Sequence, residues 1–260
     1  MRKKLIIGNW KMHLNVSQSS ILVHRLQERI ETHPDVEVVL APSSLSLQPL
    51  SLQIDRRKFK LAAQNCHWQD EGAFTGEVSA TMLRDLVHYV LVGHSERRHV
   101  FNETDDEVAK KMAAVIRNGM VPVLCVGETA GERKDKETKQ VLHDQLMVGL
   151  KNLTSDDMDK VVVAYEPVWA IGNGHFAKPH QVEEAVTVIR HNVRELFGES
   201  AERELPVLYG GSVEPDIARS YLEINGVDGL LVGGASLNYA QFSDIVDLAH
   251  QIYHSEENHG

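Results

Sequence analysis

The sequence predicts a single-domain α/β fold in which eight parallel strands, each followed by a helical segment, close into a (β/α)₈ barrel. Short, β-branched apolar runs recur along the whole 260-residue chain, and amphipathic stretches with helix start and stop signals separate them. Eight such units in a chain of this length match the usual size of the barrel. No linker, low-complexity tract or block of charge divides the chain, so we expect one domain over residues 1–260.

The predicted strands are apolar nearly throughout, which is typical of parallel strands buried on both faces. In chain order they are Leu5–Trp10, Val36–Ala41, Phe59–Asn65, Tyr89–His94, Val121–Val126, Val161–Glu166, Pro206–Gly210 and Gly229–Gly233. A doubly wound open sheet is the alternative. That fold usually has a glycine-rich phosphate loop after its first strand, whereas here the strand leads into Asn9-Trp10-Lys11-Met12. The barrel is therefore favoured.

Three of the intervening helices have clear sequence signals. One is expected after Ser17, where leucine and isoleucine recur every four residues. A second is expected over 104–119, because Thr104 and Glu107 form a capping box and a glycine closes the segment. A third should span 179–198, opened by a proline and ended by a glycine.

Composition narrows the class of partner and the compartment. The formal net charge is −10, which argues against nucleic acid as a partner. An anionic substrate would therefore need local donors. The two cysteines, Cys66 and Cys125, lie in or after apolar runs and are expected to be buried thiols in a reducing compartment. Because no secretory signal or membrane-spanning segment is evident, we expect a soluble, cytoplasmic protein.

Residues just beyond the carboxyl ends of the strands converge on one face of such a barrel. That set contains a cation, a histidine, carboxylates and two glycine-rich loops. It comprises Asn9, Lys11, Asn65, His94, Glu96, Cys125, Glu166, Gly210-Gly211-Ser212 and Gly233-Gly234.

Glu166 ends the sixth predicted strand and precedes a proline. Taken alone, it reads as a solvated carboxylate at a strand end. In the barrel it can instead be a general base, whose pKa partial desolvation would raise toward the working range.

His94 is followed by Ser95 and Glu96, which are typical of the first turn of a helix. Free backbone N–H groups there would keep the imidazole neutral and able to exchange a proton with a carbonyl oxygen. A structural histidine is the simpler alternative. A metal site with Glu96 is also possible, but no second histidine stands at another strand end, so metal is disfavoured.

Other residues at the strand ends predict how an anionic substrate would be bound. Lys11 can stabilise developing negative charge, although it can also be an exposed surface lysine or a Schiff-base lysine. The paired glycines after the seventh and eighth strands allow backbone N–H groups to approach a phosphate. The segment 167–177 has an apolar middle and predicts a lid that adds a donor such as Gly172; the alternative is a loop packed permanently on the rim. Phe74 lies in a small flexible loop, which favours insertion into a second copy and thus a homodimer; the alternative is a loop that folds back on its own subunit.

Several of these segments together resemble the motifs of the triosephosphate isomerase family. The segments are Asn9-Trp10-Lys11, Gln64-Asn65, Gly72–Glu77, Gly93–Arg98, Pro122–Glu128, Ala164–Gly172, Tyr209–Val213 and Val232–Leu237. They occur in order over nearly the full chain. The resemblance implies the TIM barrel, interconversion of dihydroxyacetone phosphate and D-glyceraldehyde 3-phosphate in central carbon metabolism, a homodimer, no cofactor and no metal.

The resemblance also implies roles for single residues, in the scheme of a glutamate base and a neutral histidine that is generally given for this family. Glu166 would move the carbon-bound proton and His94 the oxygen-bound protons through an enediol. Lys11 and Asn9 would stabilise the charge. The phosphate donors and the supporting residues would be Gly172, Ser212, Gly233 and Gly234, and Glu96, Asn65, Thr75 and Cys125.

The chain departs from the family pattern in the second half of the lid, at Asn173, His175 and Phe176, where threonine and lysine are more frequent. These residues bear on the kinetics of the lid. Two further hypotheses stay open from sequence: a non-catalytic phosphate-binding barrel, and a metal-dependent sugar isomerase or an aldolase on the same fold.

Overall fold

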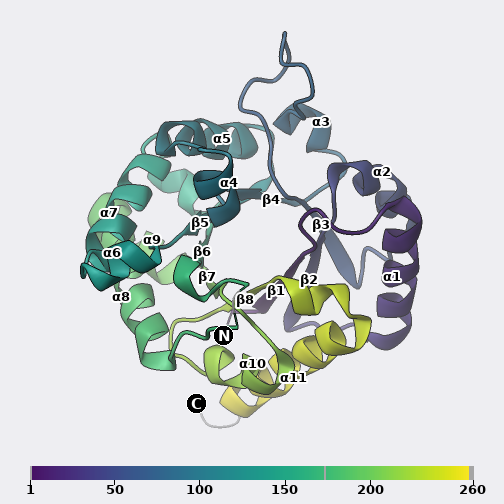
Figure 1. The fold of residues 1–260 in the computed structure, drawn as a ribbon. Coiled ribbons are helices and arrows are strands. Elements are labelled where there is room, and N and C mark those ends of the chain that lie inside the picture. Colours follow the sequence, from purple (N-terminus) through teal and green to yellow (C-terminus); the bar gives the residue numbers. More distant parts are fainter. Residues whose placement is uncertain (1, 173, 258–260) are drawn as a thin grey trace.

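The computed structural model describes residues 2–172 and 174–257, and its sheet is a closed barrel of parallel strands in sequence order (Figure 1). Its strands are β1 (Lys4–Asn9), β2 (Val36–Ala41), β3 (Phe59–Ala63), β4 (Tyr89–Val92), β5 (Val121–Val126), β6 (Val162–Tyr165), β7 (Val207–Tyr209) and β8 (Gly229–Val232). Each strand pairs with its sequence neighbour, and β8 pairs with β1 in parallel. The predicted (β/α)₈ barrel is confirmed.

Helices surround the barrel on the outside (Figure 1). The α-helices are α1 (Val16–Arg29), α2 (Ser44–Gln53), α3 (Ala80–Leu83), α4 (Ser95–Val100), α5 (Asp105–Arg117), α6 (Ala130–Lys134), α7 (Thr138–Gly149), α8 (Pro179–Phe197), α9 (Glu199–Glu204), α10 (Pro215–Leu222) and α11 (Tyr239–Glu257). Short 3₁₀ turns are η1 (Ser155–Lys160), η2 (Val168–Ala170) and η3 (Gly234–Leu237).

Several strands end earlier than the sequence predicted. The strands expected to include Asn65, His94 and Glu166 stop before these residues, as β3, β4 and β6. After β4 the chain turns at Gly93, whose φ of +71° lies in the region that favours glycine. The polar residues therefore leave the hydrogen-bonded ladder and project over the end of the barrel.

The three predicted helices are present, and the start of one of them is corrected. α1 begins before Ser17, because Asn15 and Gln18 cap each other's backbone N–H groups, a capping box that the apolar spacing did not reveal. The box at Thr104 opens α5, and α8 starts at Pro179, both as predicted.

Apolar side chains form two layers. The larger layer lies between the strands and the helices. The smaller one fills the barrel, with side chains from alternate positions of the strands such as Ile7, Val39, Leu91 and Cys125. Both cysteines are free and buried, as expected.

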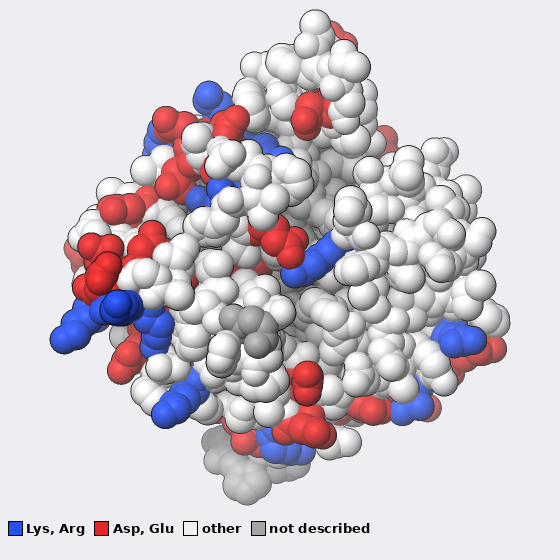
Figure 2. All heavy atoms as spheres, viewed as in Figure 1, with Lys and Arg blue, Asp and Glu red and all other residues white. Residues whose placement is uncertain are grey.

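Charge is distributed unevenly over the face that carries the carboxyl ends of the strands (Figure 2). Acidic and basic side chains gather over α5 to α8 and along the lower rim. Few lie over α1, α2 and the loop between β3 and α3 that projects from the molecule (Figures 1 and 2). Among the described residues, no helix is both long and apolar enough to cross a bilayer.

Candidate active site

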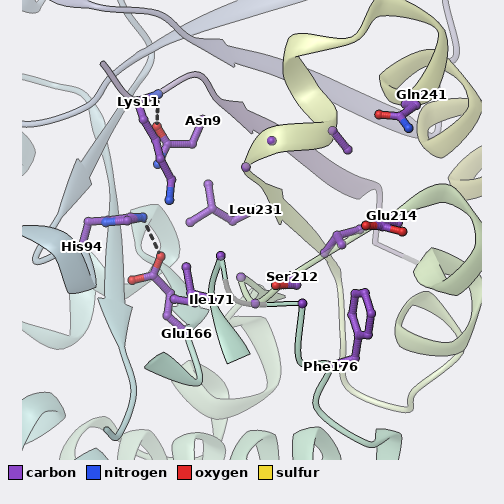
Figure 3. A pocket seen from close by; sticks show the side chains of 18 residues that line it. Asn9, Lys11, His94, Glu166, Ile171, Phe176, Ser212, Glu214, Leu231 and Gln241 are labelled. Carbon is purple, nitrogen blue, oxygen red and sulfur yellow. Dashed lines mark hydrogen bonds and ion pairs between the residues drawn. The ribbon is translucent and has the colours of Figure 1, made fainter. Parts of the chain in front are cut away.

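A cavity of about 390 Å³ opens at the carboxyl ends of the strands. It gathers most of the residues predicted to carry chemistry (Figure 3). Its lining includes Asn9, Lys11, His94, Glu166, Gly172, Ser212, Gly233 and Gly234. Side chains and loops at the ends of β1, β4, β6, β7 and β8 thus lie together, as their positions at the strand ends predicted.

At one side of the cavity His94 and Glu166 are in contact (Figure 3). Nε2 of His94 lies 2.9 Å from Oε1 of Glu166, and the side chains are 8% and 2% exposed. The other carboxylate oxygen of Glu166 accepts a 2.9 Å hydrogen bond from the backbone N–H of Ser95. Each of the two residues follows a different strand, so the barrel itself brings them together.

The start of α4 fixes the orientation of the His94 ring. Nδ1 accepts a hydrogen bond from the backbone N–H of Glu96 at 3.2 Å. A ring nitrogen that accepts a hydrogen bond carries no proton, so in the neutral ring the proton is on Nε2. Nε2 is the nitrogen that faces the cavity and Glu166.

The pKa of Glu166 corrects one expectation. Burial acts in the predicted direction and would raise it, but the adjacent His94, the N–H of Ser95 and Lys11 outweigh burial, and the pKa lies below its ordinary value. The sequence did not show that the glutamate pairs with the histidine. Burial would lower the pKa of His94, whereas the Glu166 carboxylate raises it, and within this contact the carboxylate prevails.

Lys11 is held in place by its backbone. Its φ of +52° is unusual for a residue with a side chain. Oδ1 of Asn9 accepts the Lys11 N–H at 3.0 Å, and the Gln64 amide donates to the Lys11 carbonyl at 2.8 Å. The ammonium reaches Oε1 of Glu96 at 2.6 Å and extends toward His94 and Glu166 (Figure 3). A cation is thereby positioned beside the pair.

The glycines after β7 and β8 let the backbone come close to the cavity. A Cβ on Gly210 would lie 3.0 Å from Cγ of Glu166, and one on Gly233 would lie 3.7 Å from Cε of Lys11. A Cβ on Gly234 would meet no atom within 4 Å. Gly234 also begins η3, and the first N–H groups of a helical turn have no partner within it. The arrangement suits an anion.

Ser212 connects this anion region to the predicted lid. Its backbone N–H and its hydroxyl both donate to the carbonyl of Ala170, at 3.0 and 2.7 Å. Its predicted role as a phosphate donor therefore requires those bonds to be exchanged. In the lid, Gly172 has φ +68° and Phe176 lines the cavity; Asn173 lies outside the described residues.

Glu128, for which the sequence suggested no role, anchors the base of the lid. The side chain is fully buried and accepts hydrogen bonds from the Tyr165 hydroxyl, the Trp169 indole N–H and the Arg133 guanidinium. Arg133 also covers the Trp169 ring, 4.4 Å from its centroid. The available signal was position, because Glu128 follows β5 where strand-end residues gather.

The supporting residues lie around the cavity rather than in its lining. Oδ1 of Asn65 accepts a 2.9 Å hydrogen bond from Lys111. Cys125 lies inside the barrel, where burial raises the pKa of its thiol well above the ordinary value. Thr75 lies on the projecting loop. Glu96 reaches the site through Lys11 and through its N–H on His94.

Comparison with known sequences gives a consistent picture. The family model described as "TIM: Triosephosphate isomerase" matches residues 4–249. The chain is 45% identical over 251 residues to the triosephosphate isomerase of Chloroherpeton thalassium, covering 96% of this chain and 100% of that one. Similar relatives with the same name occur in Citrifermentans bemidjiense, 44% identical with 95% and 98% covered, and in Alkaliphilus metalliredigens, 42% identical with 95% and 100% covered.

Gly127→Ala tests how the Glu166 carboxylate is positioned. A Cβ at Gly127 would lie 1.8 Å from the backbone oxygen of Glu166, so the chain around Glu166 must move. We expect a loss of roughly 3 kcal/mol or more in the free energy of unfolding. Urea denaturation measures it. Gly131→Ala on α6, where the nearest atom would be 3.9 Å away, is the control and should be neutral or stabilising; equal stability of the two variants would contradict this account.

Proposed function

The chain belongs to the triosephosphate isomerase family and is an aldose–ketose isomerase, and we propose that Glu166 and His94 carry its proton transfers. The reaction interconverts dihydroxyacetone phosphate and D-glyceraldehyde 3-phosphate. The observation that supports these roles is the 2.9 Å contact between the carboxylate and the imidazole in the lining of the cavity. Two buried proton-transfer groups at this distance can share a three-carbon substrate once it separates them.

The proton transfers balance as follows. Glu166 removes a proton from C1 of the ketose, and the electron pair moves onto the C2 oxygen to give an enediolate. His94 donates the Nε2 proton to that oxygen and takes the proton of the C1 hydroxyl. The protonated Glu166 then returns its proton to C2, and the aldehyde forms at C1. Both residues end in their starting states.

Substrate binding changes the balance of the pKa values in the required direction. When the substrate lies between the two side chains, Glu166 loses the His94 and Ser95 contacts that lower its pKa, and burial remains to raise it. His94 loses the Glu166 carboxylate, which raises its pKa more than the Glu96 carboxylate does, while burial, Lys11 and the N–H of Glu96 favour the neutral ring. The base thus becomes stronger when it is needed.

Negative charge on the substrate is met by two groups of donors. Lys11 and the Asn9 amide lie beside the reacting oxygens, where charge develops. The phosphate would lie against the backbone of Gly233 and Gly234, with Ser212 and Gly172 joining when the bonds to Ala170 are exchanged. Binding of the phosphate is thereby linked to movement of the lid.

We also propose that two copies of the chain associate through the projecting loop. Large apolar side chains are exposed around it: Met12, Leu45, Phe74 and Met82, at 95%, 80%, 42% and 62%. A second cavity, of about 320 Å³, lies between Met12, Ser44, Gly76 and Lys11. A projection beside a hollow suits an isologous dimer, in which each loop fills the partner's hollow. The hollow adjoins Lys11, so the partner's loop, with Thr75, would support the active site.

The free, buried cysteines favour a cytoplasmic location.

Glu166→Gln tests the base. The amide keeps the shape of the side chain but cannot accept the carbon-bound proton, so kcat should fall by about 10²–10⁴ while the circular dichroism spectrum is unchanged. A coupled assay without added metal measures turnover. Glu214→Gln, which changes an exposed carboxylate lining the same cavity, is the control and should retain activity; near-normal turnover of the Glu166 variant would refute the assignment.

The same substitution should lower the pKa of His94. The carboxylate raises that pKa in the parent protein, and the neutral amide does not, whereas burial and the Glu96 N–H remain. The ring should therefore stay neutral to a lower pH in the variant than in the parent. Titration of the imidazole ¹⁵N shifts measures both proteins. An unchanged or higher pKa in the variant would show that Glu166 does not control the protonation of His94.

Phe74→Asp tests the proposed dimer. A charge on the projecting loop would be buried in the partner's hollow, so the dissociation constant should rise at least about tenfold. Sedimentation equilibrium measures it, with Met147→Asp as the control, because Met147 is similarly exposed (39%) on α7. A monomeric parent protein, or equal dissociation constants for the two variants, would contradict the proposal.

A further inference from the structure

Histidines and carboxylates gather at the end of the barrel opposite the active site. Asp35 directly precedes β2, so it lies at the amino end of the strands, where its carbonyl accepts the N–H of Lys4. α11 starts near the active-site end, after η3, and its last turns return to Asp35. They carry His250 and His254, which are four residues apart and share one face of the helix.

The three side chains converge. Nδ1 of His250 lies 2.7 Å from Oδ2 of Asp35, and Nε2 of His254 lies 3.9 Å from Oδ1 of the same carboxylate. The imidazole rings meet edge to face, with centroids 4.5 Å apart. One ligand atom from each residue lies within 4.8 Å of the other two, and in the described part of the chain one group of three potential ligands comes this close.

The carboxylate is the unusual member of the cluster. The Asp35 side chain is 4% exposed, and Oδ1 is buried without a hydrogen-bond donor among the described residues. Leaving a buried charged oxygen without a partner is costly, and native proteins generally provide one. This oxygen lies 3.9 Å from Nε2 of His254, whose side chain is half-exposed.

We propose that Asp35, His250 and His254 form a binding site for a divalent transition-metal ion such as Zn²⁺. Two imidazole nitrogens and one carboxylate oxygen, with water as a fourth ligand, are a common zinc ligand set. Ligands at about 2.0–2.2 Å from a tetrahedral ion lie roughly 3.3 Å apart. The ligand atoms of Asp35, His250 and His254 lie within 4.8 Å of one another. Side-chain rotations that bring them closer by up to about 1.5 Å would therefore complete the site.

The surroundings favour a cation. The last turns of α11 place the negative end of the helix dipole at the cluster. His33 stacks on His250 with ring centroids 4.0 Å apart, and its Nε2 lies 3.8 Å from the carboxylate of Asp247. The ring packing limits the orientations open to His250. An ion bound here would join the chain before β2 to the C-terminal helix and stabilise their packing.

Zinc binding to the full-length protein tests the site. After dialysis against a chelator, calorimetric titration with ZnCl₂ should show one equivalent bound per chain, and the melting temperature should rise with zinc concentration. His254→Ala should weaken this binding at least tenfold, because the loss of even an outer-shell partner costs about 10–100-fold. Asp35→Asn, which keeps the shape of the side chain, should do the same, and neither variant should change turnover.

His24→Ala is the matched control. His24 is an exposed helical histidine with a carboxylate four residues away, at 3.3 Å from Glu28, and its loss should leave zinc binding unchanged. Binding that survives in His254→Ala, falls equally in His24→Ala, or is absent from the parent would overturn the proposal. A variant that is less stable without zinc but binds it as the parent does would show a structural cluster, and would also overturn the metal site.

Discussion

The site depends on one contact, that between the buried carboxylate of Glu166 and the buried imidazole of His94. The two residues follow β6 and β4, which are separated by β5. Adjacent strands lie about 4.8 Å apart, so the two chain ends are roughly 10 Å apart and only their side chains meet. Gly127, after β5, leaves the room that the Glu166 backbone needs. The pairing of β4, β5 and β6 therefore fixes the distance between the two side chains.

Burying the Glu166 carboxylate costs free energy, and hydrogen bonds from the neighbouring backbone offset this cost. A carboxylate at 2% exposure would be poorly solvated by itself. The Ser95 N–H binds it directly, and the Glu96 N–H orients the ring opposite it. Both donors belong to the first turn of α4, where N–H groups have no partner within the helix. The first turn of α4 thus stabilises both partners of the contact, the carboxylate through Ser95 and the imidazole through Glu96.

The sequence was sufficient to predict the barrel and to place the candidate site residues at one end of it, because both follow from short-range patterns. Buried strands read as apolar runs, and Asn9, His94 and Glu166 stand at or within two residues of the carboxyl ends of these strands. It was insufficient for contacts between distant segments. No local pattern indicates that Glu128 accepts a hydrogen bond from the indole N–H of Trp169, or that the Ser212 hydroxyl donates to the carbonyl of Ala170. The lowered pKa of Glu166 was missed for the same reason, since it depends on side-chain distances that only the folded chain defines.

α11 links the two ends of the molecule. Near its start Phe242 packs against β1, where a Cβ on Gly8 would lie 3.1 Å from the ring, and the active-site residues Asn9 and Lys11 follow Gly8. Its last turns reach Asp35 at the other end of the strands. Along its length the helix packs into the core through buried side chains such as Ile245, Val246 and Ala249. Packed interiors deform little. A ligand that holds the last turns can therefore add stability without reshaping the cavity, because the intervening core already fixes the position of β1.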